Sequence, residues 1–121
     1  MNKYDVAAWG LSYNSGWAGL TAAARELAAK FGAEVYVKEK LGGLVLEWSK
    51  GNDESGAFLY RMGRIIEIAS RATCQVCGQH FNVQMHGVCW SLCRDCRQLA
   101  DTPEGPERDQ LIEALKARAG I

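Results

Sequence analysis

The chain has 121 residues, of which 48% are hydrophobic and 23% are charged, and its 14 Lys and Arg residues balance its 14 Asp and Glu residues. This length favours a single domain, and zero net charge excludes a global field that would concentrate the protein on nucleic acid or anionic lipid. No stretch approaches the ~18 consecutive apolar residues that a membrane span needs, and the start of the chain has no apolar run of signal-peptide length. We therefore expect a cytoplasmic protein without a membrane partner.

The first predicted element is an amphipathic helix that begins at about Trp17. Ser15 is its candidate N-cap, and Gly32 is expected to stop it. Apolar residues recur at intervals of three and four, at Leu20, Ala24, Leu27, Ala28 and Phe31. Such a stripe must pack on another apolar surface.

Residues 34–48, EVYVKEKLGGLVLEW, are predicted to supply that surface as a β-hairpin. Gly42 and Gly43 permit the turn between its strands. Apolar residues alternate with polar ones along both strands, at Val35, Val37, Leu44, Leu46 and Trp48. We expect the helix to lie on the apolar face of this hairpin.

The first strand of the hairpin also carries the basic sequence KEK. Alternation places Tyr36, Lys38 and Lys40 on one strand face. One interpretation is a solvated face whose charge discourages pairing at the sheet edge. The other is a small basic and aromatic surface for an anionic partner, with Arg94 and Arg97 as further candidate residues.

A polar segment, KGNDES, separates the hairpin from a second predicted helix over about residues 55–73. Its periodic apolar residues are Phe58, Met62, Ile65, Ile66 and Ala69. This helix ends immediately before Cys74, so it leads the chain directly into a cysteine-rich segment.

All five cysteines of the chain lie within residues 72–99. An odd number cannot pair completely within the chain, and disulfides do not persist in a reducing cytoplasm. Cys74 and Cys77 form one C-x-x-C pair, and Cys93 and Cys96 form a second. Two such pairs match a tetrahedral all-cysteine zinc site, because a two-residue gap lets both sulfurs of a tight turn face one ion. We expect a structural Zn²⁺ ion, since four thiolates leave no open coordination position.

Alternative roles for these residues carry less weight. A redox C-x-x-C site does not need two pairs, and neither pair opens a helix after a clear parallel strand. Cys89 is expected to be a small buried residue, with a substitute ligand as the alternative. His80 and His86 can coordinate metal, but beside four thiolates they are expected to be a loop residue and a turn residue.

The residues between the two cysteine pairs predict a short hairpin that returns the second pair to the first. Its alternating residues are Phe81, Val83 and Met85 before a His86-Gly87 turn, and Val88, Trp90 and Leu92 after it. CRDCRQLAD then predicts a helical turn whose N-terminal dipole favours thiolates at Cys93 and Cys96. The order knuckle, hairpin, helix is typical of a treble-clef or zinc-ribbon unit. A last helix is predicted from Pro106 to Ala119, with an apolar strip of Leu111, Ile112 and Leu115.

The predicted elements together indicate an α+β protein. A layer of helix, β-hairpin and helix comes first, the zinc-binding unit follows, and a C-terminal helix ends the chain. We expect residues 1–73, 74–100 and 101–121 to form one compact domain.

The hairpin and the cysteine pairs carry a resemblance to a group of sequences. VKEKLGGLVLEW, the helix ending in TCQVCG, and GVCWSLCRDC resemble short uncharacterised proteins of bacteria and their phages, which read K-E-K-F-G-G-L-R, then T-C-x-x-C-G, then a second C-x-x-C or C-x-x-H. The resemblance spans about residues 15–97. Leu41 and Val45 depart from it, because the pattern has Phe and often Arg there, and an activity that used this Arg would be lost. The matching positions are Lys38, Glu39, Lys40, Gly42, Gly43, Leu44, Cys74, Cys77, Gly78, Cys93 and Cys96.

Three classes of function can be compared. An enzyme would need a nucleophile with a base, paired carboxylates or an open metal site, and no spacing indicates one. A nucleic-acid-binding zinc unit is the alternative, but residues 74–100 hold two arginines and one aspartate, a net charge of +1 (two minus one). We therefore expect a non-enzymatic, zinc-stabilised module that binds a protein, and exposure of Trp9 or Trp17 would favour such an interface. A phage source would make it an inhibitor of a host factor, such as a defence component, in the host cytoplasm.

Overall fold

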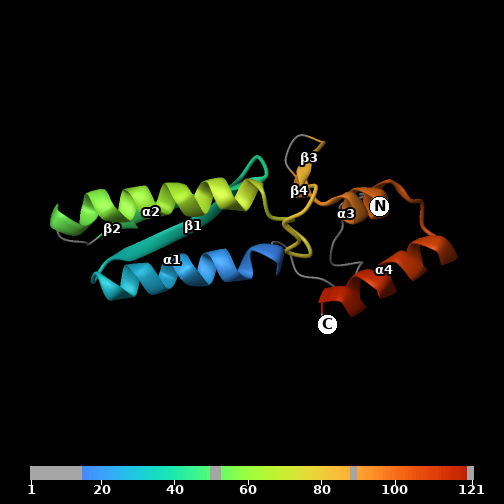
Figure 1. The fold of residues 1–121 in the computed structure, drawn as a ribbon, viewed down its shortest axis with the longest axis horizontal. Helices are drawn as coiled ribbons and strands as arrows, with labels where there is room; N and C mark the ends of the chain where they lie inside the picture. The colour runs from blue at the N-terminus through green and yellow to red at the C-terminus, as the bar shows by residue number, and fades with distance from the viewer. Residues whose placement is uncertain (1–14, 50–52, 88–89, 120–121) are drawn as a thin grey trace.

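The structure is a computed structural model that describes residues 15–49, 53–87 and 90–119. Within these ranges the chain has the predicted mixed α+β character, with two antiparallel two-stranded hairpins (Figure 1). None of the helices in these ranges combines the length and hydropathy that crossing a bilayer requires. The elements in chain order are a 3₁₀ turn, η2 (Ser15–Trp17), then α1 (Ala18–Lys30), β1 (Glu34–Lys40), β2 (Gly43–Ser49), α2 (Asp53–Arg71), β3 (Gln84–His86), β4 (Trp90–Leu92), α3 (Arg94–Asp101) and α4 (Pro106–Ala119).

The first hairpin lies beside α1 and α2, which run along it in Figure 1. Val35 pairs with Trp48 and Val37 with Leu46, so the apolar residues of both strands share one face, as the alternation predicted. That face packs with the two helices into a first core cluster. Its buried members are Trp17, Ala24, Leu44, Leu46 and Ile66.

The turn of this hairpin lies one residue earlier than predicted. Lys40 pairs with Gly43, so Leu41 and Gly42 form the turn and Gly43 is already the first residue of β2. Leu41 and Gly42 both have positive φ, 52° and 79°, as a two-residue type I′ turn requires. The amide of Gly42 donates to Oε1 of Glu39 at 2.9 Å. This bond holds a turn in which Leu41 adopts a backbone conformation that costs a non-glycine residue free energy.

One predicted cap of α1 is confirmed and the other is wrong. Gly32 has a φ of 64°, and the amide of Ala33 donates to a carbonyl of the last helical turn at 2.8 Å, which is a Schellman arrangement. At the other end the N-cap residue is Trp17, and no side chain caps the helix. Ser15, the predicted cap, donates its hydroxyl to the carbonyl of Val76 at 2.7 Å. Ser15 therefore makes a tertiary hydrogen bond and does not cap α1.

Helix α2 buries only part of the predicted stripe. Leu59 and Ile66 are 1% and 7% exposed, whereas Phe58 and Ile65 are 44% and 59% exposed. Met62 is half-buried. Periodicity could not decide between the two sides, because α2 has apolar residues around most of its circumference.

Side chains of α2 also complete the hydrogen bonds of β2. The amide of Leu44 donates to Oγ of Ser70 at 2.9 Å, and the amide of Leu46 donates to Oε2 of Glu67 at 2.8 Å. Both amides lie on the edge of β2 that does not face β1. The helix therefore closes this edge with polar side chains, in place of a third strand.

The second half of the chain packs around the cysteines. Strands β3 and β4 pair with His86 opposite Trp90, so the predicted hairpin is present but short. Phe81 is 81% exposed and Met85 48%, so these two residues do not join the core. Val88 lies outside the described residues. The predicted apolar strip of α4 packs on the second core cluster, whose buried members are Cys74, Val76, Trp90, Leu92, Cys93, Cys96, Leu99, Ala100 and Leu115.

Candidate metal centre

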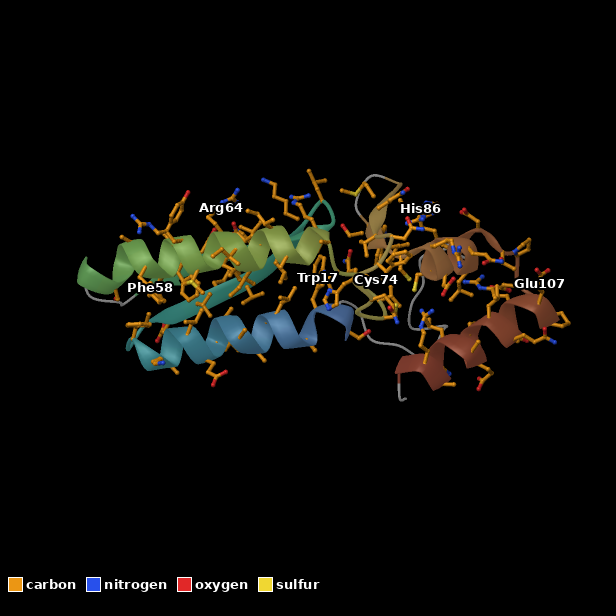
Figure 2. The ribbon with its side chains drawn as sticks, viewed as in Figure 1. Trp17, Phe58, Arg64, Cys74, His86 and Glu107 are labelled. Atoms are coloured by element: carbon orange, nitrogen blue, oxygen red, sulfur yellow. The ribbon has the colours of Figure 1, made fainter. Side chains whose placement is uncertain are left out.

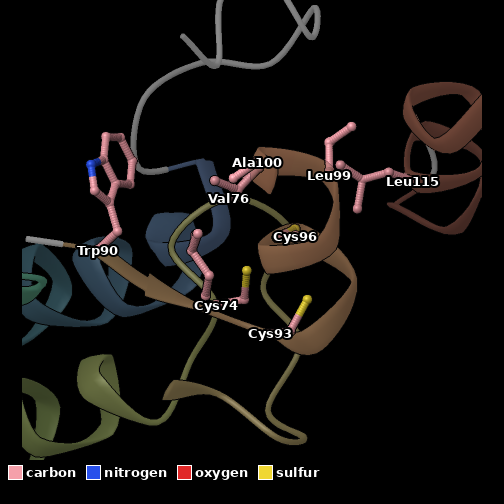
Figure 3. Packing of buried hydrophobic residues seen from close by; sticks show 9 residues of the cluster. Cys74, Val76, Trp90, Cys93, Cys96, Leu99, Ala100 and Leu115 are labelled. Atoms are coloured by element: carbon pink, nitrogen blue, oxygen red, sulfur yellow. The ribbon is translucent and has the colours of Figure 1, made fainter. Parts of the chain in front are cut away.

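Four cysteine sulfurs converge where β4, α3 and the turn after α2 meet. Figure 3 draws three of these residues, Cys74, Cys93 and Cys96. The Sγ atoms of Cys74, Cys77, Cys93 and Cys96 all lie within 4.8 Å of one another, and those of Cys77 and Cys93 are 3.6 Å apart. A zinc–sulfur bond of ~2.3 Å places the sulfurs of a tetrahedral site roughly 3.8 Å apart. All four residues are free thiols. The predicted ligands thus form one cluster of a size that can hold Zn²⁺.

The first pair lies in a tight turn that follows α2. The amide of Gly78 donates to the carbonyl of Cys74 at 3.0 Å, and the amide of Cys74 donates to the carbonyl of Gln79 at 2.7 Å. Gly78 has a φ of 81°, a conformation that residues with a Cβ rarely adopt. The turn returns Cys77 to Cys74, which explains the glycine directly after the pair.

The second pair lies at the N-terminus of α3. Cys93 is the N-cap residue, with φ −68° and ψ 169°, and its carbonyl accepts the first helical bond, from the amide of Arg97, at 2.9 Å. Cys96 lies in the first turn and is fully buried. The second pair thus lies at the start of a helix, as predicted, where the partial positive charge of the helix end attracts thiolates.

Hydrogen bonding among the sulfurs separates their pKa values. The bond with Cys77 lowers the pKa of Cys74 to about 7, and the bond with Cys74 raises the pKa of Cys77 and of Cys96. Hydrogen bonding, above all with Cys74, lowers the pKa of Cys93 as well. Two sulfurs therefore ionise at the expense of the other two. A divalent cation at the centre removes this competition, because it attracts all four thiolates.

A basic side chain from α4 contacts the cluster. Nη2 of Arg118 donates to Sγ of Cys77 at 3.5 Å, and Nη1 donates to the carboxylate of Asp95. Four thiolates around one dication have a net charge of −2 (four minus two), so the guanidinium offsets part of it. The sequence gives no signal for Arg118, because it is 41 residues from Cys77 and is one of several charged residues near the end of α4.

Apolar side chains of the second core cluster cover one side of the sulfurs. Val76, Leu99, Ala100 and Leu115 lie beside the sulfurs in Figure 3 and are all at most 5% exposed. Cys74 is fully buried, like Cys96. An ion bound here would be screened from water on this side, which is typical of a structural metal site.

The 3₁₀ turn η2 packs directly on the first cysteine pair. The amide of Gly16 donates to the carbonyl of Gln75 at 2.9 Å. A Cβ on Gly16 would lie 2.0 Å from the carbonyl oxygen of Cys74. The glycine in SGW is thus a close-approach position, which the sequence alone did not identify.

Trp17 joins this contact to the end of α2. Its side chain is fully buried, and Nε1 lies 3.0 Å from the carbonyl oxygen of Ser70 and 3.1 Å from that of Thr73, as a shared donor (Figure 2). Trp17 is therefore a core residue and gives no support for an exposed aromatic interface. Trp9 lies outside the described residues.

Comparison with models of protein families, with curated proteins and with solved structures finds no match to this chain. The resemblance of KEK-x-GGL and the cysteine pairs to short proteins of bacteria and their phages therefore remains a prediction. The structure gives three of its positions a local reason. Gly42 has positive φ in the hairpin turn, Glu39 accepts the amide of Gly42, and Gly78 closes the first cysteine turn.

The two histidines bond to other groups and lie outside the four-sulfur cluster. Nδ1 of His80 is 3.2 Å from Oγ1 of Thr73, and Nε2 of His86 is 3.0 Å from Oδ1 of Asp101. His86 is the last residue of β3, beside the predicted turn. Cys89 lies outside the described residues.

The predicted basic surface is divided between two parts of the molecule. Tyr36, Lys38 and Lys40 project from the exposed face of β1, as predicted. Lys38 bonds Oε1 of Glu47 at 2.7 Å, and this bond raises its pKa. Arg94 is exposed on α3, whereas Nη1 of Arg97 donates to the carbonyls of Asn82 and Leu92, both at 2.8 Å.

Proposed function

We propose that the protein is a zinc-stabilised binding module that acts through contacts with another protein and performs no catalysis. The observation that supports it is the set of four sulfurs within 4.8 Å of one another. Four protein thiolates fill a tetrahedral coordination sphere, and catalytic zinc needs a position for water or substrate. The ion would hold the turn after α2 against the start of α3.

We further assign the segment around the cysteines to the treble-clef or zinc-ribbon class. The support is the order of its parts: a cysteine turn after α2, the β3–β4 hairpin, and a second cysteine pair at the start of α3. In such units the metal replaces the large apolar core that a short segment cannot build. The unit is then a scaffold for surfaces elsewhere on the chain.

The charges near the metal centre favour a protein partner over nucleic acid. Arg118 is paired with Asp95, and Arg97 is bonded to two backbone carbonyls. Of the two arginines predicted for a basic surface in this segment, Arg94 is the one left to contact a phosphate, and its Nε is 3.8 Å from the carboxylate of Asp95. Nucleic-acid binding draws most of its affinity from several phosphate contacts. We expect weak binding to random duplex DNA, no tighter than the usual non-specific range of about 10⁻⁴ to 10⁻⁶ M at physiological salt.

The resemblance to short bacterial and phage proteins adds a proposal about the partner. A phage-encoded protein of this size would act in the host cytoplasm on a host factor, and a defence component is one such factor. This part of the proposal is an association and not a deduction from the site.

The function is tested by affinity capture of the zinc-loaded chain from cell lysate, with and without nuclease. We expect a protein that remains bound after nuclease treatment. Cys74→Ser should lose it, because the module loses its metal, and Cys89→Ser should retain it. Recovery of DNA or RNA alone, with no protein left after nuclease, would contradict the proposal.

A further inference from the structure

Helix α2 presents a second apolar stripe on the side that it does not bury. Tyr60, Ile65 and Ile68 are 66%, 59% and 61% exposed, although Leu59 and Ile66 on the other side are core residues. Leu41, in the adjacent hairpin turn, is 52% exposed and extends the stripe beyond the end of the helix. A helix that packs against the core on one side normally carries polar residues on its outer side. The exposed stripe on α2 is therefore a surface that needs an explanation.

Three arginines alternate with these apolar residues. Arg61, Arg64 and Arg71 are all exposed and, at helical spacing, share the outer side of α2 with Ile65 and Ile68. Arg64 lies on the side of α2 that points away from α1 in Figure 2. Apolar residues interspersed with arginine, without lysine, are typical of protein interfaces.

The described residues neutralise little of this positive charge. Arg64 pairs with Glu67 at 2.8 Å, but the side chain of Glu67 is 13% exposed and its other oxygen accepts the amide of Leu46. Arg71 donates to the carbonyl of Leu41 at 3.5 Å. Arg61 has no carboxylate partner within the described residues. Between Tyr60 and Arg71, α2 thus holds three guanidinium groups against one carboxylate, that of Glu67, which is bonded to β2.

We propose that the outer side of α2, defined by Tyr60, Arg61, Arg64, Ile65, Ile68 and Arg71, binds an acidic amphipathic helical segment of a partner protein. This inference rests on the proposed protein-binding function and gives it a surface. The surface extends over 12 residues, about 18 Å of helix, so three to four turns of a partner helix would cover it. Apolar residues of that helix would pack on Ile65 and Ile68, while its Asp and Glu residues would meet the arginines.

Two other occupants fit this surface less well. A second copy of the chain, packed α2 against α2, would bring six arginines together with two turned-in glutamates, and like charges across an interface are costly. Nucleic acid would place aliphatic Ile65 and Ile68 against phosphates or base edges, and neither side chain offers a donor or an aromatic ring for stacking.

The experiment uses a surface-displayed library of random 16-residue peptides, sorted for binding to the zinc-loaded full-length chain. Enriched peptides should be acidic, with Leu, Ile or Phe at helical spacing. For one synthetic enriched peptide, Ile65→Ser with Ile68→Ser should weaken binding by at least about tenfold, and Arg61→Glu with Arg64→Glu should do the same. Tyr36→Ser and Lys40→Glu, exposed residues on the outer face of β1, are matched controls that should leave binding unchanged.

A charge swap keeps the test decisive if one variant folds poorly. Arg61→Glu with Arg64→Glu should bind the same peptide with its Glu residues changed to Lys, and circular dichroism and zinc content verify that the variant is folded. The inference is overturned if enriched peptides are basic, if the β1 variants abolish binding and the α2 variants do not, or if no peptide is enriched. It is also overturned if the α2 variants abolish self-association or binding of an RNA oligonucleotide. Lysate capture with the unaltered chain tests the proposed function independently of α2, so the two failures are distinguishable.

Discussion

Each cysteine of the cluster supplies one of the four converging sulfurs, and the two described histidines do not take their place, because His80 bonds to Thr73 and His86 to Asp101. We expect the purified protein to hold close to one zinc ion per chain, and Cys74→Ser or Cys93→Ser to lose it. Cys89→Ser is the control and should keep full metal content, because four other thiolates suffice. Zinc content by mass spectrometry under native conditions checks this. Full zinc in a Cys74 or Cys93 variant would show that the ligand set is wrong.

Arg118 offers a residue-level test of charge at the site. Arg118→Gln should weaken zinc affinity by about tenfold, because outer groups that bond metal ligands typically contribute a factor of this size. Competition with a chromophoric chelator measures the affinity. Arg94→Gln is the control, since Arg94 also lies near Asp95 but is not bonded to a sulfur in the structure. Equal affinities for the two variants would mean that Arg118 does not stabilise the thiolates.

The ligands were predictable from sequence and Arg118 was not, for a physical reason. Each C-x-x-C pair closes a turn of a few residues, so spacing alone brings its two sulfurs together. The contact of Arg118 with Cys77 depends on how α4 packs against α3, which is set by Leu99 and Leu115. The position of a charged residue on a helix surface follows no periodic pattern, so the contact of Arg118 with Cys77 could not be predicted from the sequence.

At the scale of elements, η2 and the first cysteine turn are fitted to each other. A Cβ at Gly16 would meet the backbone oxygen of Cys74, which cannot move aside like the end of a flexible side chain. We therefore expect Gly16→Ala to destabilise the zinc-loaded protein by about 3 kcal/mol. Urea unfolding in the presence of zinc measures this.

Gly19 provides the matched control for that substitution. A Cβ at Gly19, in the first turn of α1, would meet nothing within 4 Å. Gly19→Ala should therefore be neutral or stabilise by about 0.5 kcal/mol, because alanine has the higher helix propensity. If both variants unfold at the same urea concentration, the close approach of η2 to Cys74 does not contribute to stability.

The existence of each helix and hairpin was easier to predict than the side that a helix buries or the residues at which a hairpin turns. The sequence indicated α1, both hairpins and α4 because each has a strong period or turn signal. It misplaced the first hairpin turn by one residue, since both glycines of Leu41-Gly42-Gly43 permit a turn and the pairing of Lys40 with Gly43 decides between them. A similar ambiguity applied to α2. Ile66 was predicted correctly, but Phe58 and Ile65 are exposed, and Leu59, which the predicted stripe left out, is buried.

At the scale of the whole molecule, hydrogen bonds connect the two core clusters across the metal centre. Oγ of Ser91, in β4, donates to the carbonyl of Gly42 at 2.5 Å, and the amide of Gln75 donates to the carbonyl of Ser91 at 2.8 Å. Trp17 adds its bonds to the carbonyl of Ser70, in the last turn of α2, and to that of Thr73, just after the helix. The cysteine turn therefore contacts η2 and β4 directly, and through Ser91 and Trp17 it is connected to the first hairpin and to the end of α2. Loss of the ion should consequently affect residues beyond the cysteine segment.

Removal of the ion tests this connection. A structural zinc ion contributes an apparent ~10 to 16 kcal/mol of binding free energy, comparable to the roughly 5 to 15 kcal/mol margin of a whole domain. A strong chelator under reducing conditions should therefore remove exchange protection from residues 74–100 and from the ends of the elements bonded to them, at Trp17, Gly42 and Ser70. Helix α1 and the first hairpin have their own apolar cluster, so the far-ultraviolet helix signal should fall without vanishing. Hydrogen exchange and circular dichroism are measured before chelation, after chelation, and after zinc is added back. Unchanged protection in residues 74–100 of a chain shown to be metal-free would mean that zinc does not hold the fold, and the cysteines would then require a redox or catalytic explanation.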